Sequence, residues 1–344
     1  MRRLIGRGIS SRMSTNMSGN GVAALPVTVD AEMVATVTLE PNQGAMCILD
    51  EGLIRRIEVT LGGLKGRSDL RGMILASGSP RVFVAGADLK AIMAMSHGEL
   101  EAYLAFGQRV FGMLCELAMP TVAAINGAVL GGGLELAMHC DGLVALRGQV
   151  VPGKDGGAAV VKGYPIGLPE AGLKICPGWG GTNLLAARLK DPAEGIARTC
   201  SGQTWMIDQV ETTGGAGLVD EFVAAEGGQA ELLKAAKGWL LRNATVHSKR
   251  RDGRPLKWIG RSAVVNACAK AAMDVSQRLG AEAAVDPSRA VIKAVRAGLD
   301  GGDERGWGAA LKVEREELNR LRGTPEGKGA IEAFFAKSAG GGKK

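Results

Sequence analysis

The chain has 344 residues, of which 46% are hydrophobic and 22% charged, and its formal net charge is +7. This length and apolar content predict one large globular core with an appendage, or two domains, and the 52 glycines follow no G-X-Y period, which excludes a collagen-like chain. With two Tyr and six Phe the chain is poor in rings for stacking on bases, so nucleic acid is not the expected partner, although the positive charge alone fits an acidic ligand, nucleic acid or mere solubility.

Three features of the chain bear on its location in the cell. Residues 1–26 carry four Arg, several Ser and no acidic residue, which fits a mitochondrial targeting peptide, a disordered tail or a start codon assigned too early. The six cysteines form no C-x-x-C motif and have apolar neighbours, which predicts free thiols in a reducing compartment. The longest low-charge run, 119–134, is too short to span a bilayer. We therefore expect a cytoplasmic bacterial protein without a membrane span, with the mitochondrial matrix as the alternative.

The segment before residue 120 alternates strand and helix patterns. Residues 34–40 alternate apolar and polar side chains as a half-buried strand does, and 72–77 is a short apolar run typical of a buried strand. Between them, 49–64 has the spacing of a helix. Ser96 and Glu99 form an S-x-x-E capping box, which predicts the start of another helix. The apolar face of that helix, which we expect in the core, consists of Leu100, Tyr103, Leu104, Val110, Phe111 and Leu114.

Strands and helices continue to alternate in the middle of the chain. The apolar runs 121–126 and 142–146 predict strands, with a helix beginning near Gly132 between them. The segment 147–165 is rich in Gly and Lys and predicts a surface loop or hairpin. Beyond about residue 228 only helical patterns follow, so we expect an α/β fold with an all-helical C-terminal extension. One of these late helices carries an apolar stripe of Trp307, Leu311, Leu318 and Leu321.

The loop 126–137, NGAVLGGGLELA, places three consecutive glycines just before a carboxylate. A strand that ends in glycines and runs into a helix leaves the first N–H groups of the helix unpaired, and the helix dipole adds partial positive charge there. Such a place binds an anion, either a phosphate or an oxyanion formed during a reaction. The loop matches neither phosphate-binding glycine motif, and Glu135 would repel a phosphate. The pattern therefore favours an oxyanion with Glu135 as its acid/base partner.

Two further segments are candidates to complete such a site. Residues 85–89 form a second glycine turn ahead of a helix and offer another N–H group, and two donors can make an oxyanion hole. Within this turn, Asp88 is expected to cap the helix or to orient the loop. A second carboxylate, Glu170, follows Pro169 and precedes another glycine-rich loop that leads into a helix.

Three motifs, taken in order, resemble one family. VFVAGADLKAI (82–92), TVAAINGAVLGGGLELAMHCD (121–141) and LPEAGLKICPGWGGTNLLAARL (168–189) are similar to the crotonase (enoyl-CoA hydratase/isomerase) family. Residues 215–223 resemble the segment that closes its core. The resemblance covers roughly residues 27–225 and implies a crotonase-like ββα spiral core.

The resemblance implies the addition of water to a trans-2-enoyl-CoA. The two oxyanion-hole N–H groups of the family fall on Ala87 and Gly132, and its two catalytic glutamates fall on Glu135 and Glu170. Glu135 would activate the water and Glu170 would give a proton to C2, while the N–H groups hold the thioester oxygen. Having both carboxylates favours hydration in fatty-acid β-oxidation, and a Δ3,Δ2-enoyl-CoA isomerase, which needs one, stays an alternative. No metal or separate cofactor is implied, because coenzyme A is part of the substrate.

Further positions of these motifs are expected to contact the acyl-CoA. Trp179 stands where small residues are commoner in the family, so it would narrow the site or line it. The segment 147–164 is longer than in typical members and forms an insertion near the acyl pocket. Phe334 and Lys337 resemble a Phe-x-x-Lys that reaches the CoA nucleotide in single-domain hydratases. The other expected contacts are Ala85, Asp88, Leu89, Gly131 and Pro169.

The helical tail has a narrower resemblance. Residues 288–302 and 314–337 are similar to the segment that joins the hydratase part of multifunctional β-oxidation enzymes to their dehydrogenase part. This implies a free-standing hydratase module. Together with the composition of the N-terminal residues, we expect a disordered or targeting tail at 1–26, a core at 27–227 and a helical region at 228–344. The resemblance also implies a homo-oligomer such as a trimer, or a partner of a dehydrogenase or thiolase.

Two other patterns allow different functions. His139 beside Cys140 suggests a metal or Cys–His pair, but adjacent residues on a helix point to different sides, so we expect neither. The basic run 249–261 is expected to be a solvated loop, with the 3′-phosphate of CoA or RNA as its alternative ligands. An RNA-binding protein on the same fold is therefore the second class of function.

Overall fold

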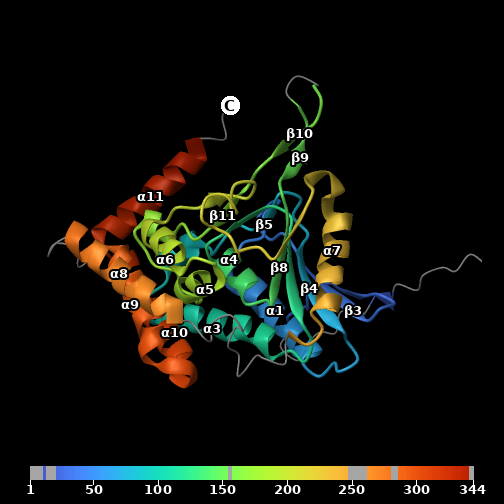
Figure 1. Ribbon diagram of the computed structural model, residues 1–344, viewed down its shortest axis with the longest axis horizontal. Helices are drawn as coiled ribbons and strands as arrows, with labels where there is room; N and C mark the ends of the chain where they lie inside the picture. Colours follow the sequence, from blue (N-terminus) through green and yellow to red (C-terminus); the bar gives the residue numbers. More distant parts are fainter. Residues whose placement is uncertain (1–10, 13–20, 154–156, 247–261, 280–285, 341–344) are drawn as a thin grey trace, which may run out of the picture.

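The computed structural model describes residues 11–12, 21–153, 157–246, 262–279 and 286–340. Within these ranges a large and a small β-sheet form the centre of the molecule, and helices lie on both sides of the large one (Figure 1). The last helices of the chain gather at one end of the molecule, away from the large sheet (Figure 1). The predicted α/β class with a helical C-terminal region is confirmed.

The larger sheet has the strand order β1-β2-β3-β4-β6-β8-β13. Strand β2 is antiparallel to β1 and β3, whereas the neighbours from β3 to β13 are parallel. β4, β6 and β8 are buried along their whole length, which explains why their sequences are apolar runs rather than alternating patterns. The bounds are β1 Ser11–Arg12, β2 Val27–Val29, β3 Val34–Leu39, β4 Gly72–Ser77, β6 Thr121–Ile125, β8 Gly142–Leu146 and β13 Glu221–Val223.

The smaller sheet has the strand order β12-β11-β7-β5. Its strands β5, β7 and β11 are parallel, and β12 is antiparallel to β11. β9 and β10 form a separate antiparallel hairpin that projects from the molecule, so the hairpin predicted as one form of 147–165 is present (Figure 1). The bounds are β5 Val82–Val84, β7 Ala128–Leu130, β9 Gln149–Val151, β10 Val160–Lys162, β11 Pro165–Gly167 and β12 Trp205–Met206.

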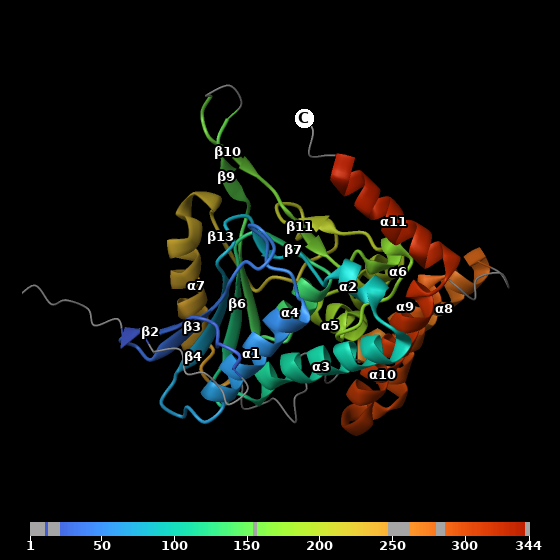
Figure 2. The same ribbon diagram turned by 180° about the vertical axis from the view of Figure 1, so that it is seen from behind.

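Helices cover both faces of the larger sheet. α7 packs on β4, β6 and β8, and α1, α3 and α4 lie on the opposite side (Figure 2). The predicted capping box is present, because the Ser96 side chain accepts from the Glu99 N–H and the Glu99 side chain accepts from the Ser96 N–H. Asp50 caps α1 in the same way by accepting from the Leu53 N–H. The bounds are α1 Glu51–Leu64, α2 Leu89–Ala94, α3 His97–Glu116, α4 Gly132–Met138 and α7 Gly228–Arg242.

The C-terminal helices pack on one another and on the core. α9 packs on α8 and α10, α6 contacts α8 and α9, and α10 also packs on α3. The predicted stripe of α10 faces inward, since Trp307, Leu318 and Leu321 are buried. The remaining bounds are η2 Glu170–Leu173, α5 Gly181–Arg188, α6 Pro192–Ser201, η3 Ala225–Gly227, α8 Ser262–Leu279, α9 Pro287–Asp300, α10 Gly302–Arg322 and α11 Pro325–Gly340.

The core begins before the predicted start at residue 27. Leu25 is 1% exposed, and its N–H donates to Oγ1 of Thr60 on α1 at 2.8 Å. At the other predicted boundary, α7 begins at residue 228, and its buried Leu232 and Leu240 share one apolar cluster with the large sheet. The division of the chain into three parts remains a proposal.

The cysteines and the helices bear on the expected location of the protein. All six cysteines are free and buried, as predicted. None of the helices in the described ranges combines the length and apolarity needed to cross a bilayer.

Candidate active site

Three parallel strands of the smaller sheet end at the same edge, and each leads into one predicted site segment. β5 leads into the turn 85–87, β7 into the three glycines, and β11 into Pro169 and Glu170. Because β7 pairs with both β5 and β11, the three segments emerge side by side. The Gly131 N–H ties two of them together by donating to the Gly167 carbonyl at 2.9 Å. A cavity of about 330 Å³ lies at this edge, closed on its other sides by residues of α2, α3, α10 and α11.

Each of the three glycines is needed because another group occupies the space of a side chain. Gly131 has φ 53°, a conformation that favours glycine, and a Cβ there would lie 2.7 Å from Oε1 of Glu170. A Cβ on Gly132 would lie 2.4 Å from Cζ3 of Trp179, and one on Gly133 would lie 2.5 Å from a carbonyl oxygen of β5. The glycines therefore let a carboxyl group, an indole ring and a strand approach the start of α4.

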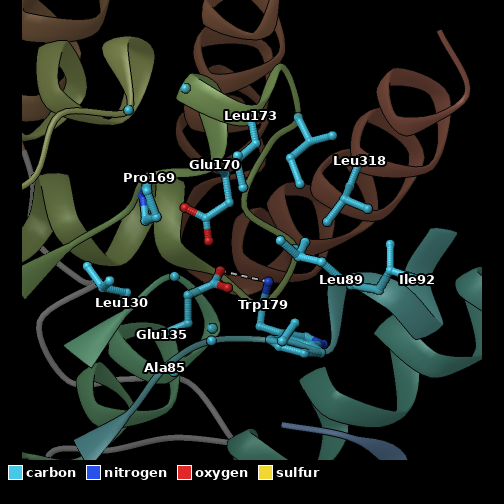
Figure 3. A pocket seen from close by; sticks show the side chains of 18 of the residues that line it. Ala85, Leu89, Ile92, Leu130, Glu135, Pro169, Glu170, Leu173, Trp179 and Leu318 are labelled. Carbon is cyan, nitrogen blue, oxygen red and sulfur yellow. Dashed lines mark hydrogen bonds between the residues drawn. The ribbon is translucent and has the colours of Figure 1, made fainter. Parts of the chain in front are cut away.

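Glu135 lies in the first turn of α4 and is 1% exposed. Its Oε1 accepts from the main-chain N–H groups of Trp179 and Gly181, both at 2.8 Å; Figure 3 shows the first of these bonds. Burial raises the pKa of Glu135 to about 7, although these hydrogen bonds act in the opposite direction. A carboxyl group with this pKa can exchange a proton near neutral pH.

Glu170 begins the short helix η2 and is also buried. Its Oε2 has no hydrogen-bond partner among the described residues. Burial, and after it the negative charge of Glu135, raise the pKa of Glu170 well above its ordinary value. Figure 3 shows the two carboxyl groups pointing toward each other within the cavity. Because two neighbouring buried carboxylates repel, one of the pair retains its proton while the other ionises.

Two main-chain N–H groups complete the polar part of the cavity. Ala87 and Gly132 both line it, and in the described part of the chain neither N–H has an acceptor. Gly132 is the first residue of α4, where helix geometry leaves the N–H groups without intrahelical partners. The turn that carries Ala87 follows β5, the parallel neighbour of β7. Both residues therefore line one cavity from neighbouring strands, each with an N–H group that lacks an acceptor among the described residues.

Most of the predicted contact residues line the cavity, and two do not. The carboxylate of Asp88 caps α2 by accepting from the Lys90 and Ala91 N–H groups at 3.0 Å, and Asp88 is not part of the lining. Lys337 lies on α11 one turn beyond Phe334 and is not part of the lining. The predicted contacts that do line the cavity are Ala85, Leu89, Gly131, Pro169, Trp179 and Phe334.

Trp179 forms a fixed part of the wall. Its ring is 2% exposed, packs on Tyr103 and Phe111 with ring centroids 5.5 and 5.2 Å away, and donates through Nε1 to the Leu104 carbonyl at 3.1 Å. The insertion 147–164 was expected near the acyl pocket, and this is wrong for its described residues. They do not line the cavity, because the β9–β10 hairpin follows β8 of the other sheet and projects outward (Figure 1).

The structure adds residues that the motifs did not indicate. Glu314 on α10 is 0% exposed and binds the loop that holds Glu135. A signal for it existed in the sequence, because it lies three residues after Leu311 and four before Leu318, on the apolar stripe of its helix. Apolar wall residues were also missed, since they come from helices outside the motifs or carry no special pattern: Ile92, Leu104, Leu130, Leu173, Ile175 and Leu318.

His139 does not line this cavity. Nδ1 of His139 lies 2.8 Å from the Glu135 carbonyl oxygen, and burial lowers the pKa of His139 to about 4, so the ring is neutral near pH 7. Within the described ranges no group of His, Cys, Asp and Glu has the arrangement of a metal site. The run 249–261 lies outside the described residues.

The chain is similar to known proteins in sequence and in fold. The family model for enoyl-CoA hydratase/isomerase matches residues 31–250. The fatty acid oxidation complex subunit alpha of Idiomarina loihiensis is 30% identical over 323 residues, which are 91% of this chain and 41% of that protein. The subunit of the same name from Vibrio cholerae is 28% identical over equal shares. The chain thus spans about two fifths of the length of these relatives.

Solved structures share the fold at low sequence identity. A carnitinyl-CoA dehydratase from Mycobacterium thermoresistibile has a TM-score of 0.61 at 17% identity, covering 90% of this chain and 89% of that one. An enoyl-CoA hydratase from Bacillus halodurans has a TM-score of 0.58 at 18% identity, covering 89% and 98%. At this identity the likeness concerns the fold, including the predicted crotonase-like core.

Proposed function

Because the chain belongs to the enoyl-CoA hydratase/isomerase (crotonase) family of acyl-CoA enzymes, we propose that it adds water across the 2,3 double bond of a trans-2-enoyl-CoA. The observation that carries the proposal is the pair of buried carboxyl groups of Glu135 and Glu170, which face each other. Two main-chain N–H groups that have no acceptor among the described residues line the same cavity. Isomerisation needs one carboxyl group to move a proton. A pair suits a reaction that places the two parts of a water molecule on neighbouring carbons.

In the proposed reaction the two carboxyl groups start in opposite protonation states. A water molecule between them gives a proton to ionised Glu135 while its oxygen bonds to C3 of the substrate. The electron pair of the double bond moves onto the thioester oxygen, and C2 then takes the proton of Glu170 as the thioester re-forms. Glu135 ends protonated and Glu170 ionised, and the product is a 3-hydroxyacyl-CoA. Proton exchange with solvent restores the starting state.

The N–H groups of Ala87 and Gly132 are proposed to stabilise the enolate formed in between. Charge develops on the thioester oxygen only as the reaction proceeds, so donors aimed at it favour the transition state over bound substrate. One such donor typically contributes a factor of about 10² to 10³ in rate. The apolar wall excludes bulk solvent, apart from the reacting water molecule, and so strengthens this interaction.

The apolar part of the cavity is proposed to hold the acyl chain. Leu89 and Ile92 of α2, Leu104 of α3 and Leu318 of α10 line it with aliphatic groups. Phe334 of α11 also lines the cavity and is 44% exposed, which places it at the opening, where the nucleotide part of CoA would lie. A contact between Lys337 and that nucleotide is part of the same proposal.

We also propose a role in fatty-acid oxidation. The support is that relatives of this chain are named as alpha subunits of fatty acid oxidation complexes. A homo-oligomer or a complex with a dehydrogenase or thiolase belongs to this proposal, as does the division into a tail, a core at 27–227 and a helical region at 228–344.

The direct test is the loss of ultraviolet absorbance when the conjugated double bond of crotonyl-CoA is hydrated. The same protein is also given a cis-3-enoyl-CoA, whose conversion to the conjugated isomer raises the absorbance. Hydration of the 2-enoyl substrate supports the proposal. Isomerisation without any hydration would replace it with the Δ3,Δ2-isomerase alternative.

The pH dependence of hydration is expected to show two limbs. Glu135 must be ionised to accept a proton, and burial raises its pKa to about 7, so kcat/KM should increase as the pH rises toward that value. Below it, kcat/KM should fall by about tenfold per pH unit. Glu170 must be protonated, and its raised pKa retains the proton until a higher pH, where activity falls again. Initial rates with crotonyl-CoA across this range check the profile, and an acidic limb centred near the ordinary pKa of a glutamate would contradict it.

Leu318→Phe is expected to shift the preference toward short acyl chains. Leu318 is 4% exposed and lines the cavity from α10, so a larger ring would fill space that a long chain needs. One methylene of misfit changes specificity by a factor of roughly 10 to 200, so kcat/KM for trans-2-decenoyl-CoA should fall by about tenfold or more. Crotonyl-CoA serves as the internal control and should react at nearly the original rate. Equal losses on both substrates would mean that the acyl chain does not reach this wall.

A further inference from the structure

A third buried glutamate lies next to the proposed catalytic pair. Glu314 comes from α10, far along the chain from the three motifs, and its side chain is 0% exposed. Oε2 accepts from the Gly180 N–H at 2.5 Å. Oε1 accepts from the N–H of Thr182 at 3.0 Å and from its hydroxyl group at 2.5 Å.

The four successive main-chain N–H groups of residues 179–182 are shared between two glutamates in strict alternation. The first and third donate to Oε1 of Glu135, each at 2.8 Å. The second and fourth donate to Glu314. Each glutamate therefore depends on a backbone conformation that also satisfies the other. Because neighbouring peptide units donate to different glutamates, a movement of the whole loop would displace the donors of both.

The loop has few other restraints at its end. Gly180 is the N-cap of α5, has φ 102°, and has no side chain to cap the helix. Glu314 takes that role from another helix, since it accepts the Thr182 N–H, which a capping side chain at Gly180 would accept. Before the loop turns, Gln108 of α3 donates to the Gly178 carbonyl at 2.7 Å and to the Leu311 carbonyl of α10 at 2.9 Å, which fixes α10 beside the loop.

All three donors to Glu314 are neutral, and a buried carboxylate without a cation is costly unless hydrogen bonds satisfy it. An apolar residue would fill the same place on the stripe without this cost. The carboxylate instead provides two acceptor atoms in a fixed plane, which matches the two N–H groups that point away from Glu135. This is the property that a positioning group requires.

We propose that Glu314 is a positioning residue, which holds the 179–182 loop so that the Trp179 and Gly181 N–H groups fix the carboxylate of Glu135. The effect expected on kcat rests on the proposed function, in which Glu135 is the general base. The C-terminal helical region then does more than cover the cavity, because it sets the orientation of the general base. The other acidic groups that face Glu314 are Glu135 and Glu170. Burial, and after it the negative charge of Glu135, raise the pKa of Glu314 to about 8, and a negative charge on Glu314 in turn raises the pKa of Glu170.

Glu314→Gln tests this role with almost no change in volume. The amide keeps one acceptor oxygen, but its NH2 group is a donor and faces either the Gly180 or the Thr182 N–H. That hydrogen bond is therefore lost, and the loop must shift to separate the two donors. Misplacement of a catalytic group by about 1 Å costs up to about 100-fold, so kcat for crotonyl-CoA should fall by about 10-fold to 100-fold. KM should stay within about twofold, since Glu314 does not line the cavity.

Glu317→Gln is the matched control. Glu317 lies one turn later on α10 and is 6% exposed, but it pairs with Lys293 and Arg320 rather than with the loop. It should retain the kcat of the wild type even if its unfolding temperature falls. Equal kcat values for Glu314→Gln and the wild type would overturn the inference.

Two additional arms keep the result decisive. Should Glu314→Gln fail to fold, two variants of Thr182 replace it. Thr182→Val removes one donor to Glu314 and should lower kcat, whereas Thr182→Ser keeps the hydroxyl group and should have the kcat of the wild type. Equal kcat values for these two variants would overturn the inference. A crystal structure of Glu314→Gln, or of Thr182→Val in its place, should show the Trp179 or Gly181 N–H displaced from Glu135. Unchanged hydrogen bonds to Glu135 would refute the positioning role, whatever the wild type catalyses. A wild type that hydrates no enoyl-CoA would instead refute only the proposed function.

Discussion

Glu135→Gln is expected to lower kcat for the hydration of crotonyl-CoA by a factor of about 10² to 10⁴, the usual contribution of a general base. The amide cannot take a proton from water. Its oxygen can still accept the Trp179 and Gly181 N–H groups that bind Oε1 now, so the loop and the fold should be retained. Because the amide does not ionise, the acidic limb of the pH profile should also disappear. Both effects follow from stopped or continuous absorbance assays at several pH values.

Glu316→Gln is the control for a change of charge alone. Glu316 lies on the outer side of α10, where 49% of its side chain is exposed and its nearest cation, Lys312, is 3.8 Å away. Its substitution should change neither kcat nor the pH profile, because exposed ion pairs contribute little. A Glu135→Gln protein that hydrates crotonyl-CoA as fast as this control would show that Glu135 is not the base.

Gly132→Ala is expected to damage stability and activity together. The new Cβ would lie 2.4 Å from Cζ3 of Trp179, a distance at which something must shift. The indole ring cannot yield easily, because it is packed between Tyr103 and Phe111 and bonded to the Leu104 carbonyl. Overpacking of this kind typically costs about 1–3 kcal/mol of unfolding free energy. Displacing the Gly132 N–H from the proposed oxyanion position should lower kcat by about 10² or more.

Gly62→Ala provides the comparison at a helical glycine of the same chain. Gly62 lies on α1, is exposed, and has no atom within 4 Å of the added Cβ. This substitution should stabilise the protein by about 0.5–1 kcal/mol, because alanine loses less conformational entropy in a helix. Urea unfolding measures both variants, and crotonyl-CoA hydration measures their activity. Equal stability of the two would mean that the ring of Trp179 moves aside without cost.

The local elements could be predicted because their causes are local. The apolar runs at 72–77 and 142–146 are strands buried on both faces, and the Ser96 to Glu99 capping box starts a helix as expected. The glycine motif also placed Glu135 in the first turn of a helix. Such features depend on side-chain periodicity and on hydrogen bonds between residues a few positions apart. Asp88 illustrates this difference. Its capping role depends on neighbouring residues and could be predicted from them, whereas its contact with a ligand was expected only from the resemblance.

Other parts of the site depend on segments that are distant in the sequence. Leu318 and Glu314 both lie on α10. Their place on its apolar stripe predicts that they are buried, but it does not predict which residues they contact. The insertion at 147–164 was placed near the cavity because it lies between the two glutamates in the chain. Strand order decides otherwise, since β9 follows a strand of the larger sheet while Glu135 and Glu170 follow strands of the smaller one.

The sequence by itself determined the α/β class, the helix starts and the two acidic side chains that follow glycine- and proline-containing turns. Only the tertiary structure decided that these turns meet at one sheet edge, that the N–H groups of residues 179–182 alternate between Glu135 and Glu314, and that burial raises the pKa of the glutamates. The physical reason is the separation along the chain over which each interaction acts. Backbone sterics and periodicity act over a few residues, whereas the pKa and orientation of a buried carboxyl group depend on every element that packs around it.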